Sequence, residues 1–308
     1  MRTSLLLVNA IALMLLASTA QASQSLDRAL ELAKAKAYRS KHVDWIDVER
    51  RARLIETAQS EDAAIQFVVS ALADKHTSYK APTSSSPTSS RQMLPQPEIA
   101  TTLPSIDQIP VLQINRWGGK DPQRATRAVR SELNEIMRQQ PCGLVLDFSA
   151  NSGGNMWPML VGLSPLLSEG PLGAFRSAGG ATNRIEKING LVTMSGKPHF
   201  LNFPPLATPV GSAQFIAIVI GDKSSSSGEI TPLMFFGQEN VMYFGRKTSG
   251  FTSANQVFPL PNGGSLVLTT SMTEDRNGHE HPDGIEPDIT SDQPFSDASK
   301  WLTEKCSG

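Results

Sequence analysis

One stretch restricts the fold of this chain more than any other, because it joins a buried strand, a tight turn and the start of a helix. Residues 216–220 are an apolar run rich in β-branched side chains, which predicts a buried strand. Gly221 and Asp222 end the run, and the serines at positions 224–227 precede an apolar segment that ends at Phe236. Serines cap helices, but they also lie where unpaired N–H groups can bind an oxyanion. Taken alone, the stretch leaves both interpretations open.

Composition limits the classes of partner. The chain has 308 residues, enough for one large domain or two small ones, and 19% of them are charged. Its formal net charge is −1 and only 6% of its residues are aromatic. We therefore expect no nucleic-acid partner and no binding to an anionic membrane surface.

The first residues have the pattern of a signal peptide. Arg2 supplies a positive charge, residues 5–17 are apolar except for Asn9, and Ala20-Gln21-Ala22 is a small-residue cleavage site. We predict a signal peptide at 1–22 and export to the periplasm or the extracellular space. The alternative is an uncleaved anchor, although the apolar stretch is short for a membrane span. After cleavage we expect no stable membrane insertion.

The two cysteines, Cys142 and Cys306, permit one disulfide in an oxidising compartment. Two cysteines alone do not show that they are close, and Cys142 directly precedes an expected buried strand. A buried free thiol is therefore an equal alternative. No spacing of cysteines and histidines resembles a zinc site, so we expect no metal.

The rest of the chain divides into three predicted parts. Residues 23–80 form a small helical subdomain, because apolar residues recur at helical spacing as far as residue 74. Residues 81–104 form a loop rich in serine, threonine and proline, either a lid or a plain tether. Residues 105–308 form the main domain.

The main domain begins with a strand–helix–strand pattern. Strands are predicted at 109–115 and 143–148, and residues 121–140 form the clearest amphipathic helix, which indicates a sheet with parallel strands. The second strand leads into a turn with Gly153 and Gly154 before another helical segment. Its spacing differs from that of a phosphate-binding loop. Residues 170–208 are expected to be an irregular insertion.

Four segments in this order resemble the C-terminal processing, or tail-specific, serine peptidases. The resemblance covers about residues 70–290 and implies an α/β fold with a crotonase-like (ClpP/crotonase) core and no cofactor. The segments are Leu-Val-Leu-Asp-Phe-Ser-Ala-Asn-Ser-Gly-Gly at 144–154, the strand and serine turn at 216–230, Gly-x-x-Thr-x-Gly at 245–250, and Gly-Ile-x-Pro-Asp at 284–288.

The family's nucleophile is the serine three residues before a glutamate, which the resemblance places at Ser226. Ser224, Ser225 and Ser227 remain alternatives. Glu229 is then expected to be a structural acid at the helix start rather than a catalytic group.

Backbone N–H groups would hold the oxyanion in such an enzyme. The resemblance assigns this role to Ser227 and to Gly153 or Gly154.

The general base departs from the commonest pattern of the family. Many members have a lysine directly after the Gly-x-x-Thr-x-Gly segment, where this chain has Phe251, and Lys247 and Lys223 are off register. Another subgroup, which includes the nisin-resistance proteins and lacks a PDZ domain, uses a histidine in a segment like Asp-Lys-His-Thr. That segment is present here and implies His76 as the base. The alternative is a histidine that only stabilises a helix end.

A third catalytic group is less defined. Glu280 is the candidate and Asp283 a weaker one, whereas Asp147 is expected to be structural. A Ser–His dyad alone is also chemically sufficient.

These observations predict an exported serine endopeptidase that cleaves extended peptides or C-terminal tails through an acyl-enzyme. The alternative is an inactive member of the same fold that binds peptides or a lipophilic ligand. An esterase is a weaker third option, because no Gly-x-Ser-x-Gly motif is present. The expected partner is a peptide or unfolded protein, and no oligomeric state is predicted.

Overall fold

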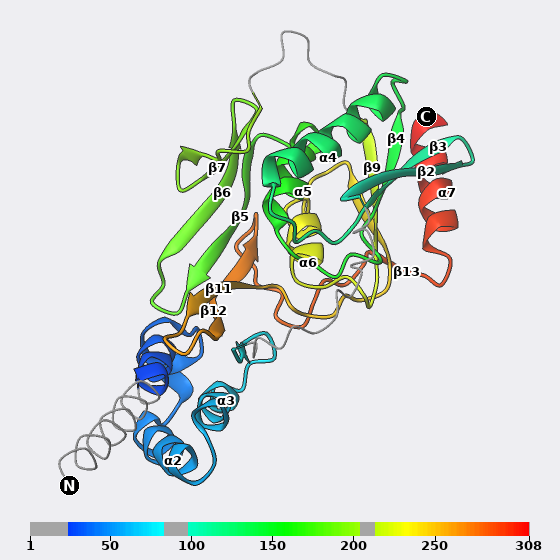
Figure 1. Cartoon of the computed structure of the whole chain (residues 1–308). Coiled ribbons are helices and arrows are strands. Elements are labelled where there is room, and N and C mark those ends of the chain that lie inside the picture. Colours follow the sequence, from blue (N-terminus) through cyan, green and yellow to red (C-terminus); the bar gives the residue numbers. More distant parts are fainter. Residues whose placement is uncertain (1–23, 83–97, 204–212, 308) are drawn as a thin grey trace, which may run out of the picture. The chain divides into compact units, whose positions relative to one another are not determined.

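The computed structural model describes residues 24–82, 98–203 and 213–307, which divide into two compact units (Figure 1). The first unit takes its described residues from Met1–Ser90, Ser177–Gly180 and Ala254–Ser271, and the second takes the remainder. The predicted signal peptide and residues 83–97 of the predicted loop lie outside the described residues. The boundaries drawn from sequence are contiguous, whereas the first unit also includes a segment from late in the chain.

Helices make up most of the first unit, as the spacing of apolar residues predicts. Two of them are capped at the N-terminus by polar side chains: Asp44 accepts hydrogen bonds from the backbone N–H groups of Ile46 and Asp47, and Ser60 accepts one from that of Ala63. The helical segments are residues 24–36, η1 (Ser40–His42), α2 (Trp45–Ala58) and α3 (Glu61–Ala71).

A hairpin completes the first unit. Strands β11 (Ser253–Pro259) and β12 (Ser265–Asp275) are joined by a turn in which Asn262 accepts the N–H of Gly264. The start of β12 pairs antiparallel with β1 (Ser78–Lys80), and Leu266 and Leu268 pack into the helical core. Strand β12 then continues into the second unit.

The second unit is built on a six-stranded sheet. Its parallel part confirms the predicted strand–helix–strand crossover, since Val111 lies opposite Val145 on neighbouring parallel strands. Only the pair β2–β3 is antiparallel. The strand order is β13 (Ile289–Thr290), β10 (Val241–Gly245), β9 (Phe215–Ile220), β4 (Gly143–Asp147), β3 (Ile109–Ile114) and β2 (Ala100–Ile106).

Helices cover both faces of this sheet (Figure 1). Leu144 and Leu146 point to a core shared with α4 (Pro122–Met137), α5 (Met156–Gly162) and α6 (Ser227–Leu233). Val145 points the opposite way, to a cluster that includes Leu302 of α7 (Pro294–Ser307). Alternate residues of one strand thus serve two cores, which is why β4 is apolar as far as Leu146. The mixed α/β class is confirmed.

The predicted irregular insertion at 170–208 is wrong for most of its length. Residues 170–198 form an antiparallel meander of β5 (Gly170–Ser177), β6 (Thr182–Ile188), β7 (Leu191–Met194) and β8 (Lys197–Pro198). One of its tight turns joins β6 to β7: Asn189 and Gly190 both have positive φ, 51° and 80°, as a two-residue hairpin turn requires. A short 3₁₀ helix, η2 (Ser164–Leu166), precedes the meander.

Cys142 and Cys306 form a disulfide within the second unit, with their Cα atoms 5.9 Å apart. The bond ties the residue before β4 to α7. Of the two alternatives left open by the sequence, the buried free thiol is therefore wrong.

Candidate active site

The serine turn connects β9 to α6, and one residue in it has a strained backbone. Ser226 is the N-cap of α6 with φ 55° and ψ −120°, a conformation that residues with a Cβ rarely adopt. Such outliers cost about 1–3 kcal/mol and persist only where the surroundings enforce them. The contacts that enforce this one are made by its neighbours.

The four serines have different environments. Ser224 is fully buried, donating to the carbonyl of Phe148 and accepting the N–H of Gly221. The hydroxyl of Ser227 is also buried and donates to the carbonyl of Gly154 at 2.6 Å. Ser225 and Ser226 are partly exposed. Two of the alternatives to Ser226 are thus engaged in holding the turn together.

Glu229 fixes the strained turn by hydrogen bonds to its backbone and to a neighbouring segment. Its side chain is fully buried, and its carboxylate accepts four hydrogen bonds. Oε2 accepts the N–H groups of Ser226 (2.9 Å) and Phe251 (2.7 Å), and Oε1 accepts the hydroxyl of Thr248 (2.5 Å) and the N–H of Gly250 (2.7 Å). A carboxylate that is engaged on both oxygens acts as an anchor for the backbone.

The Gly-Gly turn lies directly against the serine turn, and the contact leaves no room for a side chain. Both glycines have positive φ, 98° for Gly153 and 113° for Gly154. A Cβ on Gly153 would lie 2.8 Å from the carbonyl oxygen of Ser225, and one on Gly154 would lie 1.8 Å from that of Trp117. Only glycine fits at either position.

The backbone donors of the two turns differ in availability. The N–H of Gly153 donates to the side chain of Asn151 at 2.9 Å. Within the ranges that the structure describes, the N–H groups of Gly154 and Ser227 have no acceptor. Of the two predicted glycine donors, the geometry therefore favours Gly154 over Gly153.

Asn151 helps to join the two turns, and sequence reasoning did not identify this role. It is fully buried, its amide donates to the carbonyl of Ile114, and its backbone carbonyl accepts the N–H of Ser225. A Cβ on Gly228 would lie 1.9 Å from that same carbonyl oxygen. The only sequence signal is an asparagine two residues before a glycine, which is typical of many turns.

His76 belongs to the first unit, in the turn between α3 and β1. Its backbone N–H donates to Asp74 at 3.1 Å, and its carbonyl accepts the side-chain amide of Asn255 at 3.0 Å. Burial lowers the pKa of His76, Asp74 opposes the shift and Lys75 adds to it. The imidazole is therefore neutral at pH 7, as a general base must be.

The structure thus brings together Ser226, Ser227, Gly153 and Gly154, all of which lie in the second unit. Catalytic roles for these four residues, and the pairing of His76 with Ser226, stay predictions. So does the role of Glu280 as a third group; this exposed residue forms an isolated β-bridge with Glu274.

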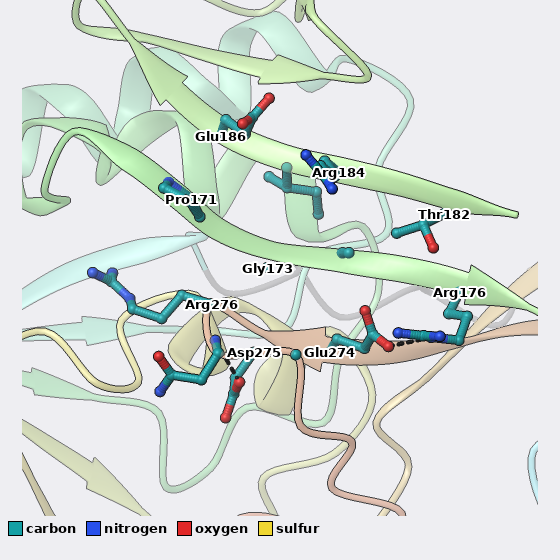
Figure 2. A pocket seen from close by; sticks show the side chains of 13 residues that line it. Pro171, Gly173, Arg176, Thr182, Arg184, Glu186, Glu274, Asp275 and Arg276 are labelled. Carbon is teal, nitrogen blue, oxygen red and sulfur yellow. Dashed lines mark hydrogen bonds and ion pairs between the residues drawn. The ribbon is translucent and has the colours of Figure 1, made fainter. Parts of the chain in front are cut away.

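A separate hollow of about 430 Å³ lies on the meander side of the second unit (Figure 2). Pro171, Gly173 and Ala174 of β5 line it together with residues of β6 and the end of β12, and an ion pair joins Arg176 to Glu274. None of the predicted site residues lines this hollow.

Among the described residues, no cluster of three or more histidine, cysteine, aspartate or glutamate side chains is suited to hold a metal ion. Within the same residues, no helix has both the length and the apolar character of a membrane span.

Both turns lie in a segment that matches a known protein family. Residues 108–291, more than half of the chain, match the sequence model of peptidase family S41. The chain belongs to peptidase family S41. The nisin-resistance protein of Lactococcus lactis subsp. lactis is 31% identical over 193 residues, which are 62% of this chain and 59% of that protein. The match therefore spans less than two thirds of that relative.

Two solved structures share the fold. A lipoprotein from Streptococcus agalactiae superimposes with a TM-score of 0.75 at 24% identity, covering 92% of this chain and 96% of that one. The photosystem II D1 C-terminal processing protease superimposes with a TM-score of 0.61 at 13% identity, covering 89% and 93%. The resemblance to tail-specific peptidases and to nisin-resistance proteins is confirmed.

Proposed function

We propose that this S41 family member is an exported serine endopeptidase with a crotonase-like core, and that Ser226 is its nucleophile. The observation that carries the proposal is the contact between the two turns. A partly exposed serine, fixed in a strained conformation, lies beside two backbone N–H groups that have no acceptor among the described residues. Acyl transfer requires a nucleophile with oxyanion donors beside it, and the two turns together would supply both.

The proposed mechanism has two half-reactions. The Ser226 oxygen attacks the peptide carbonyl carbon while the neutral ring of His76 takes the hydroxyl proton. The N–H groups of Ser227 and Gly154 bind the oxyanion of the tetrahedral intermediate. His76 then gives its proton to the leaving amine as the C–N bond breaks, which leaves an acyl-enzyme. A water molecule, deprotonated by His76, then attacks the ester carbonyl carbon. As the ester bond to Ser226 breaks, His76 returns the proton to the Ser226 oxygen and the acid product leaves.

We infer that the substrate is an extended peptide or the tail of an unfolded protein, docked along a strand edge. Export rests on the predicted signal peptide at residues 1–22, and one neighbour in structure is described as a lipoprotein.

Labelling with a fluorophosphonate probe, followed by mass spectrometry of the adduct, tests the nucleophile. We expect an adduct on Ser226 in the wild type and none in Ser226→Ala, with peptide cleavage lowered by roughly 10³-fold or more. Ser225→Ala is the matched control, because Ser225 is equally exposed on the same turn. Undiminished cleavage in Ser226→Ala would overturn the assignment.

A second candidate function is peptide binding without cleavage. Phe251, at the position where many family members have a lysine, favours it only if His76 does not reach Ser226. His76→Ala separates the two candidates. If His76 is the base, this variant loses cleavage and still binds peptide. If the wild type binds peptide but neither cleaves it nor reacts with the probe, the chain is a binder.

A further inference from the structure

The second unit contains a histidine–aspartate pair outside the proposed site. His281 Nε2 lies 3.0 Å from Oδ2 of Asp275, whose side chain is fully buried. Oδ1 of Asp275 accepts the backbone N–H groups of Asn277 (2.8 Å) and His279 (3.0 Å). Burial alone would raise the pKa of Asp275, but these hydrogen bonds outweigh it and the pKa lies below its usual value. Figure 2 shows Asp275 at the end of β12.

The side chain of His281 packs near the end of α6 that is opposite to Ser226. The ring of His281 packs edge-on against Phe236, with ring centroids 5.1 Å apart. Phe236 follows the C-terminal end of α6, whereas Ser226 caps the N-terminus of that helix. At a rise of 1.5 Å per residue, the seven residues of α6 correspond to roughly 10 Å.

The backbone of His281 nevertheless leads toward the nucleophile turn. Its carbonyl accepts the hydroxyl of Thr252 (2.7 Å) and the N–H of Gly284 (3.0 Å). The next residue, Ile285, exchanges two hydrogen bonds with Thr248, at 2.8 and 3.1 Å. Residues 281–285 therefore brace the segment 248–252 at both of its ends.

That braced segment supplies three of the four donors to Glu229, from Thr248, Gly250 and Phe251. The fourth donor is the N–H of Ser226. An unbroken series of hydrogen bonds and covalently adjacent residues thus runs from the buried Asp275 carboxylate to the strained backbone of Ser226.

We propose that His281 and Asp275 are a positioning pair for the nucleophile turn. The pair fixes the loop 281–285, the loop fixes segment 248–252, and that segment orients Glu229 against Ser226. This inference rests on the proposed function only for its effect on catalysis, because the geometry it describes is measurable without activity.

Amide hydrogen exchange tests the proposal directly. In His281→Ala we expect exchange in peptides covering 224–230 and 248–252 to accelerate at least tenfold. His281→Gln should restore slow exchange, since its amide N–H can donate to Asp275. His279→Ala is the matched control, because that side chain is 74% exposed on the same turn and its Nδ1 lies 3.8 Å from Oδ2 of Asp275, beyond hydrogen-bond distance.

Kinetics provide the second readout. His281→Ala should lower kcat and the rate of probe labelling about tenfold, with KM within about twofold of the wild type. If His281→Ala fails to fold, Asp275→Asn replaces it in both measurements, because it keeps the shape of the carboxyl and removes its charge.

The proposal would be overturned if residues 224–230 of His281→Ala exchanged their amide hydrogens at the wild-type rate. It would also be overturned if exchange were faster only in residues 275–285. A wild-type protein that is inert toward peptide and probe would refute the proposed function instead, and the exchange result would still decide the positioning role.

Discussion

Replacing Glu229 by glutamine keeps the size of the side chain and exchanges one acceptor oxygen for a donor. Each carboxylate oxygen of Glu229 accepts two hydrogen bonds. An amide group at Oε2 would face the N–H groups of Ser226 and Phe251, neither of which can turn away. At Oε1 it would face the N–H of Gly250 and the hydroxyl of Thr248, which can rotate to accept instead. The amide group therefore costs less free energy at the Oε1 position than at the Oε2 position.

The cost of that orientation follows from the donors it affects. One buried N–H, that of Gly250, loses its acceptor at about 1–3 kcal/mol, and the two bonds to the remaining oxygen lose their charge assistance. We expect Glu229→Gln to lower the free energy of unfolding by about 2–4 kcal/mol, which corresponds to roughly 4–16 °C in Tm. Relaxation of the strained φ of Ser226 should also slow probe labelling at least tenfold.

Thermal unfolding by circular dichroism and the labelling rate together measure this effect. Glu239→Gln is the matched control, because Glu239 is exposed in the same unit. If Glu229→Gln unfolds within about 0.5 kcal/mol of the wild type and labels at the same rate, the carboxylate does not anchor the turn.

Three further predictions follow. Gly154→Ala should lower the labelling rate about 100-fold or more, since the added Cβ would lie 1.8 Å from a carbonyl oxygen; a normal rate would exclude Gly154 as an oxyanion donor. If His76 is the base, kcat/KM should fall with decreasing pH through an apparent pKa below about 6.5. Lys75→Met should move that pKa upward by removing a nearby positive charge, and an unmoved profile in pH-dependent kinetics would contradict the assignment. Replacing Cys142 and Cys306 together by serine should destabilise the protein by about 5 kcal/mol, because the disulfide closes a loop with a sequence separation of 164; an unchanged unfolding midpoint would refute this.

Local patterns were enough to predict the parallel part of the sheet. The apolar runs at 143–148 and 216–220 are buried on both faces, so each reads as a strand without knowledge of its partners. The meander at 170–198 was missed because half-exposed strands with frequent turns carry little apolar periodicity. The pairing of Cys142 with Cys306 depends on α7 packing beside β4, which is a tertiary contact.

In the candidate site, too, local patterns did not predict the tertiary contacts. The motifs identify which glycines and serines belong to it, but the destination of each hydrogen bond appears only in three dimensions. The N–H of Gly153 donates to Asn151, so a side chain two residues away makes Gly154 the favoured one of the two glycine donors. His281 and Asp275 carry no motif, because their pairing comes from the closure of a turn.

The hydrogen bonds of Asn151 limit how the two turns can evolve. Its side-chain oxygen serves the Gly-Gly turn and its carbonyl serves the serine turn, while its amide reaches β3. The two turns therefore share one residue, and a substitution that reshapes either must be acceptable to the other. We expect sequence variation to accumulate outside this shared residue, at positions where a change affects at most one of the two turns.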